Sequence, residues 1–414
     1  MPNHHLSPHY YAFTTIAAAA TCFFVFQNFG YHDQYFYGAI LLVATFWGAG
    51  FWRRQQRGGS AFYVEKQQSL GKLLRRAVVR YLVWSTVFAS GLYFYNIQPY
   101  YHANVKTIQF LTHLFVIFLV IGIPYFLVTL KCKASRVEDF YDPAIRLLHI
   151  ARHLGRGLLA KKNRPLTVRV LKRSTNRKVL LNLVMRCYFI PVMVVQVFNG
   201  YRDTVGLAAT DFNGYQTLAI ISWITAFLWL TDSLTASTGY AIESRWLENR
   251  SRSVDMTVSG WLVCLCCYAP LNQVTGAVFA FSPLVASTDP STMVFPFVWL
   301  LVALKIAEAC LLGCLVYCDL SLGPSGVNIT FKKLQDRGPY SIVRHPATVC
   351  KLTFWWLSSV LFIKFWSVEI IIGQVMWNAI YILRALSEER HLSQFAEYRQ
   401  YKERVRYRFI PGII

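Results

Sequence analysis

The chain reads IQFLTHLFVIFLVIGIPYFLVTL over residues 108–130, which is 23 residues without an Asp, Glu, Lys or Arg. An α-helix rises about 1.5 Å per residue, so a run of this length can cross the roughly 30 Å hydrocarbon core of a bilayer. The stretch therefore predicts a membrane-spanning helix, and the fold class follows from how often such runs recur.

Similar apolar runs recur through all 414 residues. They predict an all-α, polytopic membrane bundle of ten spans, at residues 11–29, 35–52, 77–96, 108–130, 179–199, 214–231, 257–282, 293–318, 347–365 and 367–384. The first run is not expected to be a cleavable signal, because no Lys or Arg precedes it and a second run follows almost at once.

The composition excludes several classes of protein. Apolar residues make up 55% of the chain and charged residues only 15%, against about 25% in an average protein, which excludes a disordered chain. Three of the ten cysteines, Cys310, Cys314 and Cys318, recur inside one apolar run, and no paired CxxC motifs occur, so neither a metal site nor a disulfide framework is expected. A net charge of +22 would indicate nucleic acid in a soluble domain, but here it is better explained by topology.

The basic residues fall in alternate connections between the predicted spans. Segments 53–76, 131–178, 232–256 and 319–346 hold seven, fourteen, three and four of them, and seven more lie from Arg384 to the end. The opposite connections hold only Lys106 and Arg202. Because cytoplasmic loops collect Lys and Arg, this pattern predicts that both termini are cytoplasmic. No nucleic-acid partner is expected.

The segment 131–178 is long, basic and amphipathic. Its apolar residues, which include Ile145, Leu154, Leu158 and Leu159, are spaced among Arg and Lys. This pattern indicates a helix that lies on the anionic inner leaflet. A regulatory or substrate-recruiting role is the alternative, and the N-terminal region 1–256 otherwise has no role that its sequence indicates.

The chain reads KKLQDRGPYSIVRHPATVC over residues 332–350. Gly338 and Pro339 predict a turn, and Pro346 suits the first turn of a helix, where no amide hydrogen is needed. Arg344 and His345 would then lie at the positive end of that helix. They could equally serve only as headgroup anchors.

The tenth predicted span ends in RALSEERHL, residues 384–392. Arg384 and Glu388 are four residues apart and so share one helix face. A carboxylate pair, Glu388 and Glu389, is poorly placed for anchoring because inner-leaflet lipids are anionic. The alternative is an ordinary surface ion pair. Beyond it, the spacing of aromatic residues in the tail predicts a helix that folds back against the membrane surface.

These pieces together resemble the C-terminal signature of the isoprenylcysteine carboxyl methyltransferase and phospholipid methyltransferase superfamily. Members are integral membrane enzymes that use S-adenosylmethionine. The resemblance covers roughly residues 300–414 and suggests a methyltransferase-like domain at 257–414 with its motifs in 332–414. It rests on Gly338-Pro339-Tyr340, Arg344-His345-Pro346, Glu388-Glu389 with Leu392, and Tyr398, Tyr401 and Ile410-Pro411.

The resemblance implies roles for individual residues. The cofactor would be held by Lys333, Leu334, Gln335, Tyr340, His345, Pro346, Thr348, Glu388, Glu389 and Tyr398. Arg344, His345 and Arg384 would be catalytic, and Arg384 would face the carboxylate of the substrate. The family usually has Tyr and Gly where Thr348 and Cys350 stand here, and a His where Lys332 stands. These departures bear on the substrate more than on the cofactor.

The residue chemistry agrees with the implied cofactor. S-adenosylmethionine carries a sulfonium, an ammonium and a carboxylate, so its pocket requires aromatic faces, a carboxylate and a basic group. Tyr340, Tyr398, Glu388 and either Lys333 or Arg344 supply that set. A carboxylate acceptor, with a pKa near 4, needs no general base, so Arg384 as its clamp favours O-methylation of a lipophilic acid.

Polar groups inside the predicted spans offer further candidates. Lys351 lies two turns into the helix that begins at Pro346 and is expected to contact the substrate. Two other sets, Lys305 with Glu308 and Gln374 with Asn378, are read either as functional groups or as hydrogen bonds between helices.

Three alternatives to O-methylation remain. One is N-methylation of a phospholipid amine, which would need a base to remove a proton. The second is a sterol-reductase-like enzyme that uses NADPH, because the chain end at 407–414 resembles that family. The third is a non-catalytic transporter or scaffold. In each case the protein is expected in a bacterial inner membrane or the endoplasmic reticulum, and the enzyme readings place the site on the cytoplasmic face.

Overall fold

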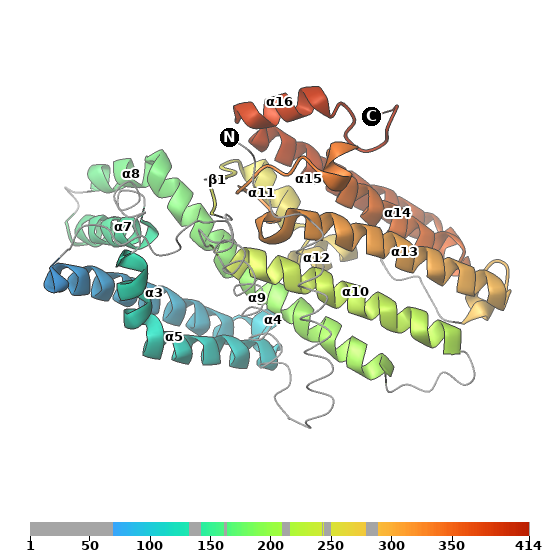
Figure 1. The fold of residues 1–414 in the computed structure, drawn as a ribbon, viewed down its shortest axis with the longest axis horizontal. Helices are drawn as coiled ribbons and strands as arrows, with labels where there is room; N and C mark the ends of the chain where they lie inside the picture. Colours follow the sequence, from blue (N-terminus) through green and yellow to red (C-terminus); the bar gives the residue numbers. More distant parts are fainter. Residues whose placement is uncertain are drawn as a thin grey trace. The chain divides into compact units, whose positions relative to one another are not determined.

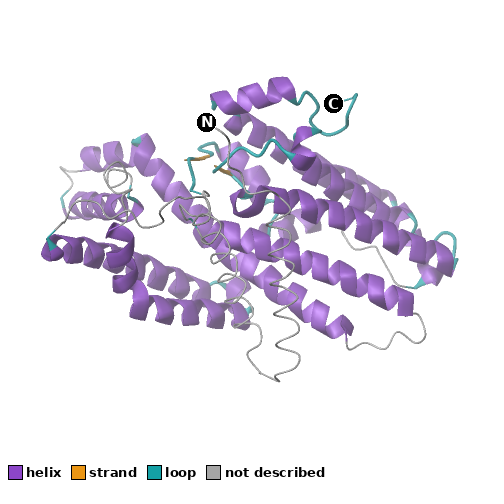
Figure 2. Ribbon diagram, viewed as in Figure 1, coloured by secondary structure: helices purple, strands orange, loops and turns teal. Residues whose placement is uncertain are grey.

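The computed structural model describes residues 69–131, 142–160, 164–208, 216–241, 243, 250–278 and 289–413. Helices, 3₁₀ turns included, take up 81% of these residues (Figure 2). The only sheet among them is a pair of two-residue antiparallel strands, β1 (Ser253–Val254) and β2 (Thr330–Phe331). The predicted all-α class is confirmed.

Contacts between residues divide the described part of the chain into two compact units, one that ends at Pro191 and one that begins at Val192. The division falls inside α9 (Ser174–Ala208). The boundary expected after residue 256 concerned motif content and stays a prediction.

The unit that ends at Pro191 contains a helical hairpin and two shorter helices. α3 (Leu70–Ile97) and α5 (Val105–Lys131) pack side by side, joined by the single turn α4 (Pro99–His102) (Figure 1). The basic segment forms α7 (Pro143–Leu159) and α8 (Arg164–Lys172), which pack on each other. Its predicted helical character is confirmed, whereas its contact with a membrane stays a prediction.

The unit from Val192 holds the helices that carry the sequence motifs (Figure 1). α13 (Val298–Leu322) packs on both α10 (Gln216–Ala241) and α14 (Pro346–Val360). α15 (Val368–Leu392) follows α14, and α16 (Ala396–Arg404) closes the chain as the predicted tail helix. Shorter elements are α11 (Val258–Leu265), α12 (Leu271–Val278), η3 (Pro290–Thr292), η4 (Gly323–Ser325), η5 (Gly338–Ser341) and η6 (Ile363–Trp366).

Six described helices are long and apolar enough to cross a membrane: α3, α5, α9, α10, α13 and α15. They coincide with six of the ten predicted spans, so the chain is a helical membrane protein on length and composition. The predicted spans 11–29 and 35–52 lie outside the described residues. The side on which each terminus lies stays a prediction.

Two predicted spans differ from the structure. The span at 257–282 was wrong as one helix, because α11 ends at Leu265 and α12 begins only at Leu271. Pro270 lies at this break, where it has no amide hydrogen for an uninterrupted helix. The span at 347–365 is shorter than predicted, since α14 has only 15 residues and ends at Val360. The carbonyl of the next residue, Leu361, accepts a hydrogen bond from Val294 N instead (2.9 Å).

Candidate functional site

The framework of the site is the packed core where α10, α13 and α14 meet. Leu312, Leu315, Val316, Leu320 and Phe354 are buried there as one cluster. Beyond this cluster α13 ends at Leu322, and the next residue, Gly323, has a φ of +55°, which lies in a region that side chains disfavour. The chain therefore leaves the helix sharply and enters the loop that carries the first motif residues.

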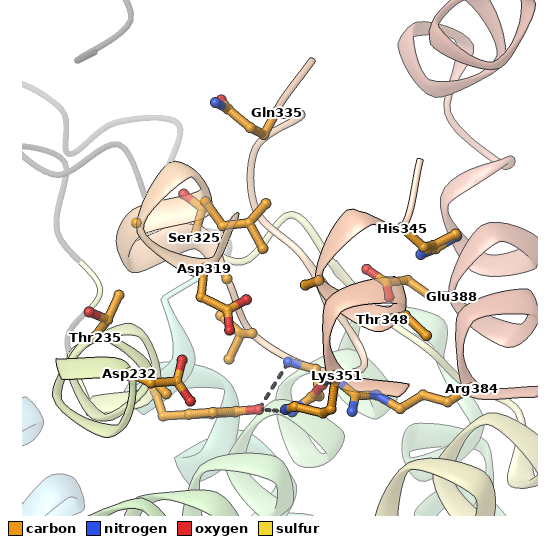
Figure 3. Close-up of a pocket in the computed structure, with 18 of the residues that line it drawn as sticks. Asp232, Thr235, Asp319, Ser325, Gln335, His345, Thr348, Lys351, Arg384 and Glu388 are labelled. Atoms are coloured by element: carbon orange, nitrogen blue, oxygen red, sulfur yellow. Dashed lines mark hydrogen bonds between the residues drawn. The ribbon is translucent and has the colours of Figure 1, made fainter. Parts of the chain in front are cut away.

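A cavity of about 540 Å³ opens beside this framework. It is lined by α9, α10, the end of α13, the loop that follows it, the first turns of α14, the end of α15 and α16. All its described lining residues belong to the unit from Val192. Figure 3 shows polar side chains from α10, α13, α14 and α15 pointing into it. Its volume lies within the range of about 300 to 1,000 Å³ that small-molecule sites occupy.

The structure brings together most of the residues that the sequence singled out. Eleven of them line the cavity: Lys333, Leu334, Gln335, Tyr340, Arg344, His345, Thr348, Lys351, Arg384, Glu388 and Tyr398. Two, Pro346 and Glu389, are not among its lining residues. Pro346 is the first residue of α14, as expected. Residues about 65 positions apart in the sequence thus share one cavity.

Arg384 lies in the cavity wall among neutral groups. It donates a hydrogen bond to Asn328 Oδ1, and its guanidinium lies 5.5 Å from the ring centres of both Tyr268 and Tyr381. No carboxylate in the described part of the chain forms an ion pair with it. A guanidinium held by an amide and two aromatic faces keeps its charge available for an anionic ligand.

Asn328 connects Arg384 to two buried phenols. Its side-chain nitrogen donates to the hydroxyls of Tyr240 and Tyr268 (2.8 Å to the latter), and its backbone nitrogen donates to Tyr240 (3.0 Å). The next residue, Ile329, has a φ of +62°, which is an outlier for a β-branched side chain. Strained backbone of this kind persists where the surroundings fix it, commonly at functional sites.

The opposite wall of the cavity is acidic. Asp232 in α10 and Asp319 in α13 face each other in Figure 3, with Lys351 and Arg384 also labelled in that view. Asp319 is within electrostatic reach of Asp232, Lys351 and Arg384. No described residue forms an ion pair with either aspartate or with Lys351. The cavity is therefore lined by both acidic and basic side chains, and the two aspartates interact with each other.

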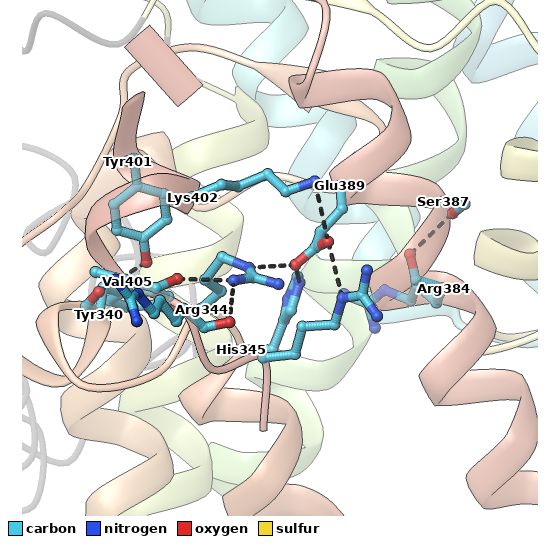
Figure 4. Close-up of polar contacts among 11 residues, drawn as sticks. Tyr340, Arg344, His345, Arg384, Ser387, Glu389, Tyr401, Lys402 and Val405 are labelled. Carbon is cyan, nitrogen blue, oxygen red and sulfur yellow. Dashed lines mark hydrogen bonds and ion pairs between the residues drawn. The ribbon is translucent and has the colours of Figure 1, made fainter. Parts of the chain in front are cut away.

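Glu389 belongs to a different arrangement, the Glu389 cluster, which we define as Arg344, His345, Glu389, Lys402 and Arg408 (Figure 4). Its oxygens lie 2.6 Å from Arg344 Nε, 3.3 Å from His345 Nε2 and 3.1 Å from Arg408 Nε. The side chains of Arg344 and Glu389 are only 5% and 4% exposed. A buried carboxylate surrounded by cations fastens chain segments together.

The Glu389 cluster fixes the tail of the chain to the start of α14. Arg344 Nη1 donates to the carbonyls of Val405 and Arg406, both at 2.7 Å. The backbone nitrogens of Arg344 and His345 donate to Tyr407 and Arg408 (3.0 and 2.9 Å). Since most donors of Arg344 are used in this way, its expected catalytic role gives way to a positioning role in our interpretation.

Tyrosines complete the wall between the first motif and the tail. Tyr401 donates from its hydroxyl to the carbonyl of Tyr340 (2.7 Å), and Tyr398 packs beside it in a buried cluster with Val405. Burial raises the pKa of Tyr340, Tyr398 and Tyr401 well above the ordinary value for tyrosine. All three therefore stay neutral at physiological pH and present uncharged aromatic surface.

The sequence did not identify three important lining residues: Asp232, Asp319 and Asn328. The two aspartates fell just outside the predicted spans, which ended at 231 and 318, whereas α10 and α13 continue to Ala241 and Leu322. Acidic residues directly at the end of an apolar run were the available signal for them. Asn328 had no such signal, because its role depends on contacts with distant segments.

Other polar groups of the predicted spans pair with each other. Lys305 Nζ lies 3.0 Å from Glu308 Oε2, and both side chains are largely buried. Gln374 donates to Asn378 Oδ1 (3.5 Å) along α15. Each of these two contacts lies within a single helix, α13 or α15, so the expected hydrogen bonds between helices stay a prediction, and none of the four residues lines the cavity.

Within the described ranges, no group of three or more His, Cys, Asp or Glu residues could hold a metal ion. Comparison of the chain with protein-family models, with curated proteins and with solved structures finds no match in any of the three. The function is therefore argued from the cavity and its residues.

Proposed function

We propose that the chain is an integral-membrane methyltransferase that transfers a methyl group from S-adenosylmethionine to a lipophilic acid. The observation that carries the proposal is that Arg384, which forms no ion pair with any described carboxylate, shares one cavity with Tyr340, Glu388 and Tyr398. We further propose that the protein resides in a bacterial inner membrane or the endoplasmic reticulum and that this cavity faces the cytoplasm, following the distribution of basic residues.

The residues around the first motif fit the methyl donor. Glu388 offers a carboxylate to its ammonium, and Lys333 offers a cation to its carboxylate. Tyr340 and Tyr398 offer neutral aromatic surface to the adenine or the sulfonium. The cavity is also large enough for donor and acceptor headgroup together, by the volume range of known ligand sites.

The residues around Arg384 fit an acidic acceptor. A guanidinium can hold a carboxylate with two parallel hydrogen bonds, which fixes the orientation of the attacking oxygen. Lys351 adds a second cation to the same cavity. Tyr268 and Tyr381 flank Arg384 and restrict the directions from which an acceptor can approach it.

Methylation of a carboxylate requires no proton transfer from the acceptor. When bound, S-adenosylmethionine supplies an electrophilic methyl carbon on a positively charged sulfur. An acceptor carboxylate held by Arg384 attacks that carbon, a C–O bond forms as the C–S bond breaks, and the bonding electron pair stays on sulfur. The acceptor is already ionised at neutral pH, so positioning by Arg384, Lys351 and the tyrosines is the main contribution of the protein.

A second candidate is N-methylation of a lipid amine, which the pair Asp232 and Asp319 favours. An amine must lose a proton to react, and a carboxylate beside it can both bind the ammonium and accept that proton. The replacement Asp319→Asn discriminates between the two reactions. We expect it to reduce amine methylation at least about a hundredfold, the lower end of the range for loss of an acid–base group, and to leave acid methylation within about twofold.

The proposal is tested by incubating membranes that contain the protein with S-adenosylmethionine labelled in its methyl group. Label that enters the lipid fraction and is released by mild base is an ester and supports acid methylation. Label that resists base and stays in the headgroup supports amine methylation. Membranes with Glu388→Gln are the matched control, and equal labelling in control and wild type would contradict the assigned site.

Two rivals predict different binding behaviour. A reductase binds NADPH, and a transporter or scaffold binds neither NADPH nor the methyl donor. Calorimetry of the purified protein with each compound separates them. Binding of S-adenosylmethionine that Glu388→Gln weakens supports the proposal, whereas binding of NADPH alone overturns it.

A further inference from the structure

The structure places a strongly basic surface in the unit that ends at Pro191, which contains none of the residues that line the cavity. Residues 143–178, which include α7 and α8, contain eleven Lys and Arg residues and no Asp or Glu. Among these cations, Arg152, Arg169, Lys172 and Arg173 are exposed. So high a density of one charge requires an anionic partner or strong hydration.

Exposed leucines lie at the end of α7 and the start of α8, the two packed helices that we call the α7–α8 hairpin. Leu158 and Leu159, at the end of α7, are 81% and 90% exposed, and Leu166 and Val168 at the start of α8 are about half exposed. A nucleic acid offers little to aliphatic side chains, whereas a bilayer accepts them among its acyl chains beneath the anionic headgroups. The combination therefore favours a lipid surface over a nucleic acid.

The hairpin is rigid at the point where these leucines emerge. Thr167 Oγ1 donates to the carbonyl of His153 (2.9 Å), and a side chain at Gly157 would meet Thr167 Oγ1 at 2.4 Å. Glycine is thus required at 157 for α7 and α8 to approach each other so closely. These contacts hold the end of α7 against the start of α8.

Two attachments hold the hairpin beside helices that could cross the membrane. Asp142, the N-cap of α7, accepts a hydrogen bond from the buried Arg80 of α3 (2.7 Å). At the other end only Arg173 separates α8 from α9. Since α3 and α9 are both candidate spans, the hairpin cannot move far from the membrane surface.

We propose that the α7–α8 hairpin is a docking surface for anionic lipid, in which Leu158 and Leu159 insert among the acyl chains while the surrounding Arg and Lys bind the headgroups. The occupant is the bilayer that holds the protein. This inference does not depend on the methyltransferase proposal, since it uses none of the cavity residues.

The test is hydrogen exchange of the full chain in lipid nanodiscs, read on peptides from 143–172. One set of discs contains phosphatidylcholine alone, and the other also contains phosphatidylglycerol. We expect the backbone of the hairpin to exchange at least about fivefold more slowly in the anionic discs, an effect of the size that one cation contributes at an anionic surface, and to lose this difference at high salt.

Two variants separate charge from insertion. Arg152→Gln with Arg169→Gln should remove most of the protection, because each cation near an anionic surface contributes about fivefold to binding. Lys106→Gln with Arg202→Gln removes the same charge from connections predicted to lie on the other side, and should change nothing. Leu159→Ser should reduce protection in both kinds of disc. Equal exchange in neutral and anionic discs for the wild type overturns the proposal, as does slowing by an RNA oligonucleotide but not by phosphatidylglycerol.

Discussion

Arg384 and Glu389 lie within two helical turns of each other on α15, but their charged groups have opposite surroundings. In the Glu389 cluster, the carboxylate is paired with the cations around it, and Glu389, Arg344 and His345 are buried. Arg384, by contrast, contacts Asn328, Tyr268 and Tyr381, forms no ion pair with a described carboxylate, and faces a cavity. The comparison separates scaffold from site: paired buried charges hold the chain together, whereas a charge without an ionic partner in a cavity is available to a ligand.

The comparison predicts that removing Glu389 affects stability most. Glu389→Ala leaves the buried Arg344 without its partner, and breaking a buried pair in this way costs about 3–5 kcal/mol. We expect poor yield and a markedly lower unfolding temperature, measured in detergent against the wild type. Glu388→Ala is the matched control one residue away, and it should leave the unfolding temperature nearly unchanged. Equal destabilisation by both variants would contradict the assignment of Glu389 to the scaffold and of Glu388 to the cavity.

The reverse behaviour is expected at Arg384. Arg384→Met should leave the unfolding temperature close to that of the wild type, since no ion pair is lost. It should raise the KM for an acidic acceptor about tenfold to a hundredfold, because hydrogen bonds to charged groups contribute about 1.5–3 kcal/mol. Steady-state kinetics with the acceptor varied measures this. Arg384→Lys should recover part of the affinity, and an unchanged KM in Arg384→Met would contradict a clamp for the carboxylate.

A smaller effect is expected from Asn328, which accepts a hydrogen bond from Arg384. Asn328→Ala removes the acceptor for Arg384 and the donors to Tyr240 and Tyr268. We expect KM for the acceptor to rise about tenfold with little change in kcat, as for the loss of one hydrogen bond to a charged group. A purely structural role would lower stability and leave the ratio of KM to kcat unaffected. The conservative Asn328→Gln tests whether an amide alone suffices.

The fold could be predicted from the sequence where length and hydrophobicity decide it. Six predicted spans coincide with α3, α5, α9, α10, α13 and α15, because a long run without charges has few other structures available. The break between α11 and α12 was not predicted, since Pro270 sits in an apolar run that reads as one span and proline occurs in spanning helices too. The ends of the helices were also not predicted exactly: α13 continues beyond the predicted boundary at 318 and so includes Asp319.

The site could be predicted only in part. The motif residues were found because their order along the chain resembles a family signature, and most of them line one cavity. What each does there was not predictable. Glu388 and Glu389 are neighbours with the same chemistry, yet the turn of α15 directs one towards the cavity and the other into a buried cluster. Such a difference depends on packing by α16 and the tail, which no local pattern encodes.

The smallest change in stability is expected from an ion pair that is exposed to solvent. Arg404 of α16 pairs with Asp336 in the first motif, with side chains 61% and 27% exposed. Solvent screens such a pair, so Arg404→Gln should lower the free energy of unfolding by about 1 kcal/mol at most. Chemical denaturation at low and high salt measures it, with Arg399→Gln on the same helix as the control. Arg404 and Arg344 both connect the C-terminal tail to residues 332–350. If Arg404→Gln lowered the free energy of unfolding as much as Glu389→Ala, the connection of the tail, and not the burial of the charges, would determine stability.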